Sequence, residues 1–264
     1  MIFLKLTLFY KLLKYRSLPA FLFDRNKVKL ACSDMASDKN ITLHYGDGSP
    51  PCWTVQIALE EKGIVDFTSK KYSFEKNEPK SEPVLAVNPR GELPCLEVGE
   101  VIVSESLAAC LYLEEKFVNQ GTRLLPTDVD ERALVWQRLM EFYWTLPRRC
   151  YKHYISYLWL TPVSEQDPAY VEKARQECVA ELCMWEKHLS ESRGGFIAGD
   201  KFGICDVVAF PWFAFFERLG LKFERRFGSI HKYLDRLRDR PSIKKYWPTQ
   251  WDGTINDTVL QDLN

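Results

Sequence analysis

The segment Ser49-Pro50-Pro51-Cys52 places a hydroxyl and a thiol at the expected start of a helix. It follows an apolar stretch at residues 41–45 and precedes a helical pattern at residues 53–61. Unpaired backbone N–H groups and the helix macrodipole favour negative charge at a helix N-terminus, and they lower the pKa of a thiol held there. The segment therefore predicts a site that stabilises a thiolate.

The Ser-x-x-Cys spacing leaves two residues as candidates for the chemistry. Two thiols in a Cys-x-x-Cys motif can form a disulfide, whereas the Ser49 hydroxyl can only donate a hydrogen bond to sulfur. Ser49 is therefore the candidate catalytic residue, with the reactive sulfur arriving in a ligand, and Cys52 is the alternative thiol. A plain N-cap role for Ser49 stays open, because Ser followed by Pro is also an ordinary helix start.

The composition indicates a globular chain that is long enough for two domains. Its 264 residues are 46% hydrophobic and 14% aromatic, which is sufficient for substantial cores. Lys plus Arg and Asp plus Glu number 36 each, so no global basic field favours nucleic acid or an anionic membrane as a partner. Eight cysteines without a Cys-x-x-Cys pair favour a reducing compartment, and four scattered histidines predict no metal site.

Residues 1–39 differ in character, since their apolar and aromatic residues are interrupted by basic ones. No apolar run reaches the ~18 residues that a membrane span requires. We interpret these residues as a disordered extension, or as an upstream start with Met35 as an alternative beginning. A basic amphipathic segment for membrane surfaces or organelle targeting stays open.

Hydrophobic periodicity predicts an α/β domain at residues 40–118 and an all-helical domain at residues 130–251. The first domain has the order strand, helix, strand, helix, strand, strand, helix, which gives a small mixed sheet with helices packed on it. Residues 119–129 break the periodicity and predict a linker, and residues 252–264 form a tail.

The expected strands are 41–45, 67–74, 93–98 and 100–103, and the expected helices are 50–62, 78–87, 104–117, 130–159, 170–190, 205–219, 230–239 and 242–247. Pro147 predicts a bend within the longest helix. Asp206 follows Gly203 by three residues and lies in the first turn of a helix, where a carboxylate is favourable. We interpret Asp206 as structural, not catalytic.

Two more segments of the first domain offer groups to a ligand. Leu93-Pro94 begins the third strand, and a cis bond there would turn the Leu93 N–H and C=O toward a ligand, although the segment alone favours an ordinary turn. Glu105 can receive an ammonium group and Ser106 a carboxylate at the start of the next helix, with simple capping as the open alternative. These groups, taken with Ser49, predict a zwitterionic, peptide-like ligand that carries its own thiol.

The motifs, in this order, resemble those of soluble glutathione S-transferases. The resemblance covers about residues 40–251 and includes the Asn-Pro-x-Gly-x-Leu-Pro segment at 88–94 and a Gly-Asp-Lys-Phe-x-x-x-Asp-Val element at 199–207. The stretches at 48–53, 88–91 and 240–244 are most similar to the rho class.

This resemblance implies a thioredoxin-like N-terminal domain, an all-helical C-terminal domain and a cytoplasmic homodimer. It implies conjugation of glutathione, the co-substrate, to small hydrophobic electrophiles in detoxification, without a cofactor, nucleic acid or stable membrane insertion. Ser49 matches the hydroxyl that donates to the glutathione sulfur. Leu93 and Pro94 match the clamp for the cysteinyl moiety, and Glu105 and Ser106 match the holders of the γ-glutamyl end.

Aromatic residues on the first helix of the second domain predict the electrophile pocket, with Tyr143, Trp144 and Tyr151 as its candidates. Two alternatives to conjugation stay open. Cys52 suits glutathione-dependent thiol transfer or dehydroascorbate reduction, because a cysteine can form a mixed disulfide with glutathione. Family domains also serve as non-catalytic interaction modules.

Overall fold

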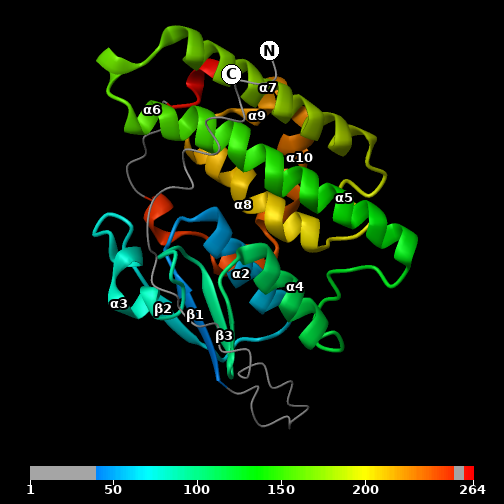
Figure 1. Ribbon diagram of the computed structural model, residues 1–264. Coiled ribbons are helices and arrows are strands. Elements are labelled where there is room, and N and C mark those ends of the chain that lie inside the picture. Colours follow the sequence, from blue (N-terminus) through cyan, green and yellow to red (C-terminus); the bar gives the residue numbers. More distant parts are fainter. Residues whose placement is uncertain (1–39, 253–258) are drawn as a thin grey trace, which may run out of the picture. The chain divides into compact units, whose positions relative to one another are not determined.

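A computed structural model describes residues 40–252 and 259–264 of the chain (Figure 1). The predictions for residues 1–39, including the disordered extension and the start at Met35, lie outside the described residues. So does part of the predicted tail. Among the helices that are described, none combines the length and the apolar character needed to cross a membrane.

Four short strands form a mixed sheet in the order β2-β1-β3-β4. β1 (Ile41–Tyr45) pairs in parallel with β2 (Thr68–Lys71), and β3 (Cys95–Val98) is antiparallel to both β1 and β4 (Val101–Val103). Helix α2 (Pro50–Glu61) forms the crossover that a parallel pair requires. The predicted mixed sheet is confirmed; β1 has the predicted bounds, and the other three strands are shorter than the apolar pattern indicates.

Helices α2 and α4 (Ser106–Lys116) pack against each other and lie between the sheet and the helical part of the chain (Figure 1). The helix expected at residues 78–87 is divided into η4 (Glu78–Lys80) and α3 (Glu82–Leu85). Each of the two short helices has a proline in its first turn. The N–H groups of a first turn have no partner within the helix, so proline removes no helical hydrogen bond there.

The remainder of the described chain is helical, as predicted. Its elements are α5 (Val129–Leu146), η5 (Pro147–Ile155), α6 (Ser156–Leu160), η6 (Val163–Glu165), α7 (Pro168–Glu191), α8 (Ile204–Arg218), α9 (Phe223–Arg226), α10 (Gly228–Arg238), α11 (Pro241–Lys245), η7 (Thr249–Asp252) and η8 (Gln261–Leu263).

At Pro147, where the sequence predicts a bend, the α-helix changes to a π-helix. Proline has no N–H for the ordinary helical hydrogen bond, which is consistent with the change there.

Helix α8 forms the centre of the helical core, since 12 of its 15 residues are buried. Its first turn is held by Asp206, whose carboxylate accepts the backbone N–H groups of Ile197 and Gly203, each at 2.9 Å. A buried helix start needs partners for its free N–H groups. The structural role predicted for Asp206 is confirmed.

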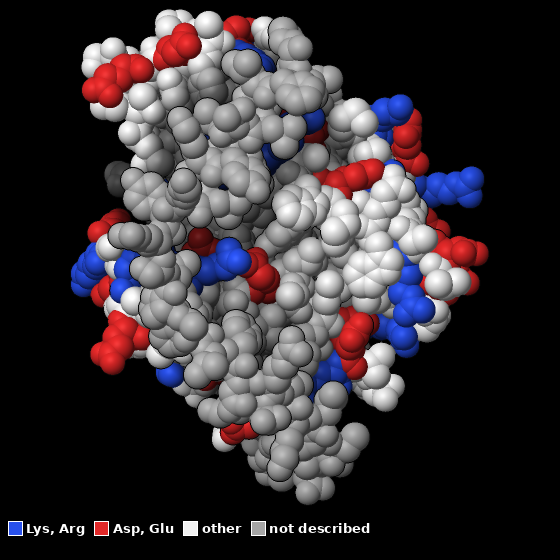
Figure 2. Space-filling view, in the orientation of Figure 1, with Lys and Arg blue, Asp and Glu red and all other residues white. Residues whose placement is uncertain are grey.

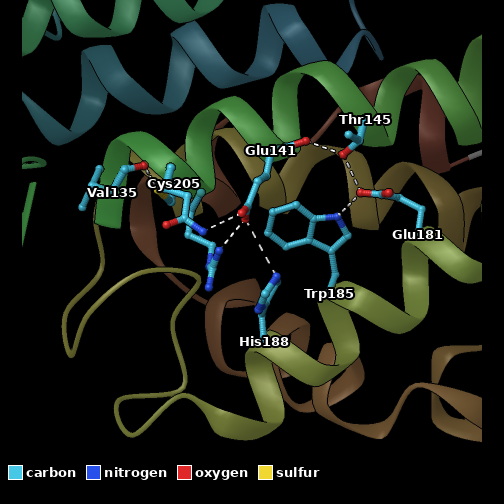
Figure 3. A network of polar contacts seen from close by, with 9 residues as sticks. Val135, Glu141, Thr145, Glu181, Trp185, His188 and Cys205 are labelled. Carbon is cyan, nitrogen blue, oxygen red and sulfur yellow. Dashed lines mark hydrogen bonds and ion pairs between the residues drawn. The ribbon is translucent and has the colours of Figure 1, made fainter. Parts of the chain in front are cut away.

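A polar network joins α5 to α7 inside the helical part (Figure 3). The buried Glu181 carboxylate accepts the Trp185 Nε1–H at 2.7 Å and the Thr145 hydroxyl at 2.6 Å. One helical turn before Thr145, Glu141 lies 3.8 Å from His188. Burial lowers the pKa of His188, so this pair contributes little charge attraction at neutral pH. The network therefore depends mainly on the hydrogen bonds to Glu181.

Lys62, at the C-terminal end of α2, forms a fully buried ion pair. Its Nζ donates to Glu114 of α4 at 2.9 Å and to the Thr122 carbonyl of the predicted linker at 3.2 Å. The other carboxylate oxygen of Glu114 accepts the Leu125 N–H at 3.2 Å. Lys62 is 0% and Glu114 2% exposed. This ion pair connects α2, α4 and the predicted linker.

Its neighbour, Glu61, binds the C-terminal part of the chain. The Glu61 carboxylate accepts the Arg240 Nε–H at 2.6 Å and an Nη2–H at 2.7 Å, and it also accepts the Ser242 hydroxyl. Arg240 itself lies over the Phe202 ring at 3.7 Å. Bidentate pairs of this kind fix both the distance and the orientation of their partners. Glu61 therefore holds the start of α11 against the end of α2.

Replacing Lys62 by Met tests the importance of the buried ion pair. The substitution removes the cation and leaves the Glu114 carboxylate buried without its partner. We therefore expect the free energy of unfolding to fall by about 3–5 kcal/mol. Urea unfolding followed by circular dichroism measures this loss.

Lys245→Met provides a matched control near the same end of α2. Lys245 pairs with Glu60 at 2.6 Å but is 45% exposed, and an exposed pair contributes at most about 1 kcal/mol. If Lys62→Met destabilises the protein no more than Lys245→Met does, the role assigned to the buried pair is wrong.

Candidate active site

The strand directions bring the three predicted ligand-binding segments to one edge of the sheet. Because β1 and β3 are antiparallel, Ser49 follows the end of β1 at the edge where Leu93-Pro94 precedes β3. Because β3 and β4 are antiparallel, β4 ends at that same edge, and Glu105-Ser106 follows it. Three segments that are separate in the sequence thus converge on one region.

Ser49 is the N-cap residue of α2, but its side chain makes no capping hydrogen bond. Pro50 and Pro51 occupy the first two helical positions and have no N–H to donate. Ser49 bonds to the helix through its backbone alone, because its carbonyl accepts the Trp53 N–H at 3.0 Å. Ser49 thus occupies the N-cap position before a proline, as the capping interpretation predicts, but its hydroxyl makes no hydrogen bond to the helix backbone.

The Ser49 hydroxyl lies near the sulfur of Cys52 and lowers the pKa of that thiol. Cys52 is 1% exposed, and its Sγ also accepts the Gly46 N–H at 3.4 Å. Burial raises the pKa of Cys52 to about 11, and the hydrogen bonds from Ser49 and Gly46 offset only part of that effect. The Cys52 thiol is therefore protonated at neutral pH, which makes it a poor nucleophile.

The peptide bond between Leu93 and Pro94 is cis, whereas the segment alone favours an ordinary turn. Within residues 40–252 and 259–264, neither the N–H nor the C=O of Leu93 forms a hydrogen bond. Both groups are therefore free to pair with the backbone of a peptide-like ligand.

Glu105, and not Ser104 or Ser106, is the N-cap residue of α4, and its side chain makes no capping hydrogen bond. The simple capping interpretation is therefore wrong here. Ser106 is the first helical residue and is 6% exposed. The Glu105 Oε2 atom accepts the Tyr143 hydroxyl of α5 at 3.2 Å. The start of α4 is thus contacted by the helical part of the chain.

The three residues predicted for the electrophile pocket lie in three different environments. Tyr143 contacts Glu105, as described above. Tyr151 is half-buried, with its ring centroid 5.7 Å from that of Trp212 and 6.1 Å from that of Phe215. Trp144 is 69% exposed and takes part in none of the ring pairs formed by the described residues. The spacing along one helix did not reveal that these side chains diverge.

Sequence analysis missed the segment η7, which lies beside the Ser49 loop. The Thr249 hydroxyl donates to Asp47, two residues before Ser49, at 2.9 Å. Trp251 packs edge-to-face on Trp53 with centroids 5.5 Å apart. These contacts join residues about 200 positions apart. Because they arise from tertiary folding, local periodicity carries no signal for them.

A cavity of about 450 Å³ lies away from this region. It is lined by residues 123–127, the beginning of α5, the loop at residues 198–203 and the first two residues of α8. None of the predicted ligand-binding residues lines it.

Figure 2 shows acidic and basic side chains interspersed over the described part of one face.

Comparisons with known proteins agree with this fold. The model of the glutathione S-transferase N-terminal domain matches residues 43–121, and that of the glutathione S-transferase C-terminal domain matches residues 139–241. A thioredoxin-like sheet joined to a helical domain defines the class as glutathione-dependent transferases. The chain belongs to the glutathione S-transferase family and is an enzyme of that kind.

Among its relatives, glutathione S-transferase A of Pleuronectes platessa is 42% identical over 85% of this chain and 99% of its own length. The crystal structure of a glutathione S-transferase from the Antarctic clam Laternula elliptica superimposes with a TM-score of 0.78 at 36% identity, covering 85% of this chain and all of that one. Ure2p in complex with glutathione, at 21% identity and a TM-score of 0.71, shares the fold over 79% of this chain and 98% of its own. The rho class stays a prediction, since none of these names states a class.

Cys52 and Cys183 provide a matched pair of thiols, one buried and one exposed. At neutral pH we expect iodoacetamide to label Cys183 at least about tenfold faster than Cys52, because Cys52 is inaccessible and its raised pKa keeps it protonated. Its thiolate fraction should increase with pH and reach one half only near pH 11. Peptide mass spectrometry of labelled protein measures both rates, and equal labelling would contradict the buried, protonated state.

Proposed function

We propose that this glutathione S-transferase conjugates the glutathione thiolate to small hydrophobic electrophiles, with Ser49 as the catalytic hydroxyl. One observation carries the proposal. The Ser49 hydroxyl lies at the start of α2, makes no hydrogen bond to the helix backbone, and lowers the pKa of the nearby Cys52 thiol. A ligand sulfur at this position would accept the same hydroxyl.

The proposed chemistry stabilises the anionic form of the bound thiol. A free thiol has a pKa of about 8.5 and is only a few per cent thiolate at neutral pH, so lowering the pKa by a unit or two gives most of the available gain. The thiol proton leaves to solvent, and the sulfur forms a bond to the electrophilic carbon as any leaving group departs with its electron pair. The hydroxyl and the α2 N-terminus stabilise the thiolate, and the bound geometry supplies proximity.

Glutathione recognition is proposed to use the other two segments at the sheet edge. The free N–H and C=O of Leu93 are suited to pair with the cysteinyl moiety, next to the cis Pro94. Glu105 is suited to the γ-glutamyl ammonium and Ser106 to its carboxylate, because Ser106 lies in the first turn of α4. Glutathione is thus a co-substrate, and the proposal includes no cofactor.

Of the residues predicted for the electrophile pocket, Tyr151 has the most suitable surroundings. It packs among aromatic rings that extend through Phe215 to Trp251, whose partner Trp53 lies four residues after Ser49. Trp144 projects into solvent in the single chain. We therefore assign the hydrophobic acceptor site to the Tyr151 side of the helical domain.

We infer further that the enzyme acts in xenobiotic detoxification as a cytoplasmic homodimer of the rho class. Six of the seven described cysteines are buried free thiols, which suits a reducing compartment. We place the domain boundaries at residues 40–118 and 130–251, with the linker at 119–129 and the tail at 252–264. The end of α4 and the start of α5 support the linker bounds.

The thiol-transferase alternative has less support. It requires a Cys52 thiolate that is accessible to a disulfide, whereas burial raises the pKa of this thiol and excludes solvent from it. The interaction-module alternative predicts a protein that does not turn over electrophiles at all.

Replacing Ser49 by Ala tests the proposed role of the hydroxyl. We expect the turnover of 1-chloro-2,4-dinitrobenzene to fall about 100-fold at neutral pH, because one preorganised donor to the anion is lost. The pKa of bound glutathione, followed by ultraviolet thiolate absorbance, should rise toward the free value of about 8.5.

Cys52→Ala is the matched control at the same helix start. It should retain turnover and the lowered pKa of the bound thiol, since the reacting sulfur belongs to the ligand. A silent Ser49→Ala together with an inactive Cys52→Ala would instead establish the redox mechanism. A wild-type protein that neither binds glutathione nor turns over the electrophile would establish the interaction module.

A further inference from the structure

We propose that Tyr143 is a positioning residue for Glu105, which it orients toward the ammonium group at the γ-glutamyl end of glutathione. The inference rests on the glutathione site proposed above and concerns one residue of the helical domain. It gives Tyr143 a role on the glutathione side of the active site, in place of the electrophile pocket that the sequence predicts.

The geometry of the contact supports this role. The Tyr143 hydroxyl donates to the Glu105 Oε2 atom at 3.2 Å. Within the described residues, the Oε1 atom of Glu105 has no hydrogen-bond or ion-pair partner. A carboxylate accepts on both of its oxygens. One oxygen is therefore held by the protein, and the other is open to a cationic ligand group.

Glu105 depends on Tyr143 for its orientation because it has no other side-chain anchor in the part of the chain that is described. It does not cap α4, and no Lys or Arg there pairs with it. A glutamate side chain that is free to rotate loses conformational entropy when a ligand immobilises it. The Tyr143 hydrogen bond fixes the carboxylate before the ligand binds.

The hydroxyl is suited to act as a permanent donor. Burial raises the pKa of Tyr143, the charge of Glu105 raises it further, and a hydrogen bond with Ser106 lowers it only in part. The hydroxyl therefore keeps its proton at neutral pH. Its hydrogen bond to Glu105 places the polar end of Tyr143 at the start of α4.

Tyr143→Phe removes the hydroxyl and keeps the ring. We expect the KM and the Kd for glutathione to rise about five- to tenfold, the effect of losing one hydrogen bond to a charged group. The kcat at saturating glutathione, the KM for 1-chloro-2,4-dinitrobenzene and the pKa of the bound thiol should stay unchanged. If Tyr143 instead lined the electrophile pocket, Tyr143→Phe would raise the KM for 1-chloro-2,4-dinitrobenzene and leave the KM for glutathione unchanged.

Glutaryl-cysteinyl-glycine, which is glutathione without the γ-glutamyl amino group, provides the decisive comparison. If Tyr143 acts through Glu105 on the ammonium group, Tyr143→Phe should weaken glutathione binding but leave the Kd of this analogue unchanged in isothermal titration calorimetry. Equal weakening of both ligands would overturn the inference and leave the proposed glutathione site intact. If the wild type binds both ligands equally, Glu105 has no role in ammonium binding, and that part of the proposed function fails.

Two further variants separate positioning from general structural damage. Tyr112→Phe, on α4, removes a hydroxyl that makes no hydrogen bond within the described residues, so glutathione binding should be unchanged. In a Glu105→Gln background, Tyr143→Phe should weaken glutathione binding less than about twofold further, because residues that act through one interaction are not additive. Full additivity of the two changes would contradict the inference.

Discussion

The candidate active site depends on the buried ion pair between Lys62 and Glu114. This pair joins the C-terminal halves of α2 and α4, which run in the same direction from the same edge of the sheet. Their N-termini present Ser49 and Glu105. A buried lysine without a carboxylate partner is costly, so this pair holds the two helices, and with them Ser49 and Glu105, in a fixed relation.

The helical domain is attached to these two helices at both ends. Arg240 binds Glu61 at the C-terminal end of α2, and Tyr143 binds Glu105 at the N-terminal end of α4. Aromatic packing of Trp53 against Trp251 adds a contact near Ser49. The helical domain therefore contacts the candidate site both at the Ser49 loop and at Glu105.

The Cys52 thiol is buried and has a raised pKa, although its position in the motif suggests a reactive thiolate. A thiol at a helix N-terminus is expected to have a lowered pKa, yet burial outweighs the dipole and raises it. The two prolines bring Cys52 to the third helical position, where its side chain turns into the domain. The less buried of the two residues is Ser49, whose hydroxyl is the group that a ligand thiol would require as a donor.

The sequence by itself determined the order of strands and helices, the mixed sheet, the structural role of Asp206 and the family, because these follow from local periodicity, capping and short motifs. Only the tertiary structure decided that the Ser49 side chain does not cap its helix, that Tyr143 reaches Glu105 while Trp144 faces solvent, and that η7 lies beside the Ser49 loop. These outcomes depend on which side chains meet across the fold. Helical spacing defines a face but does not specify what that face will contact.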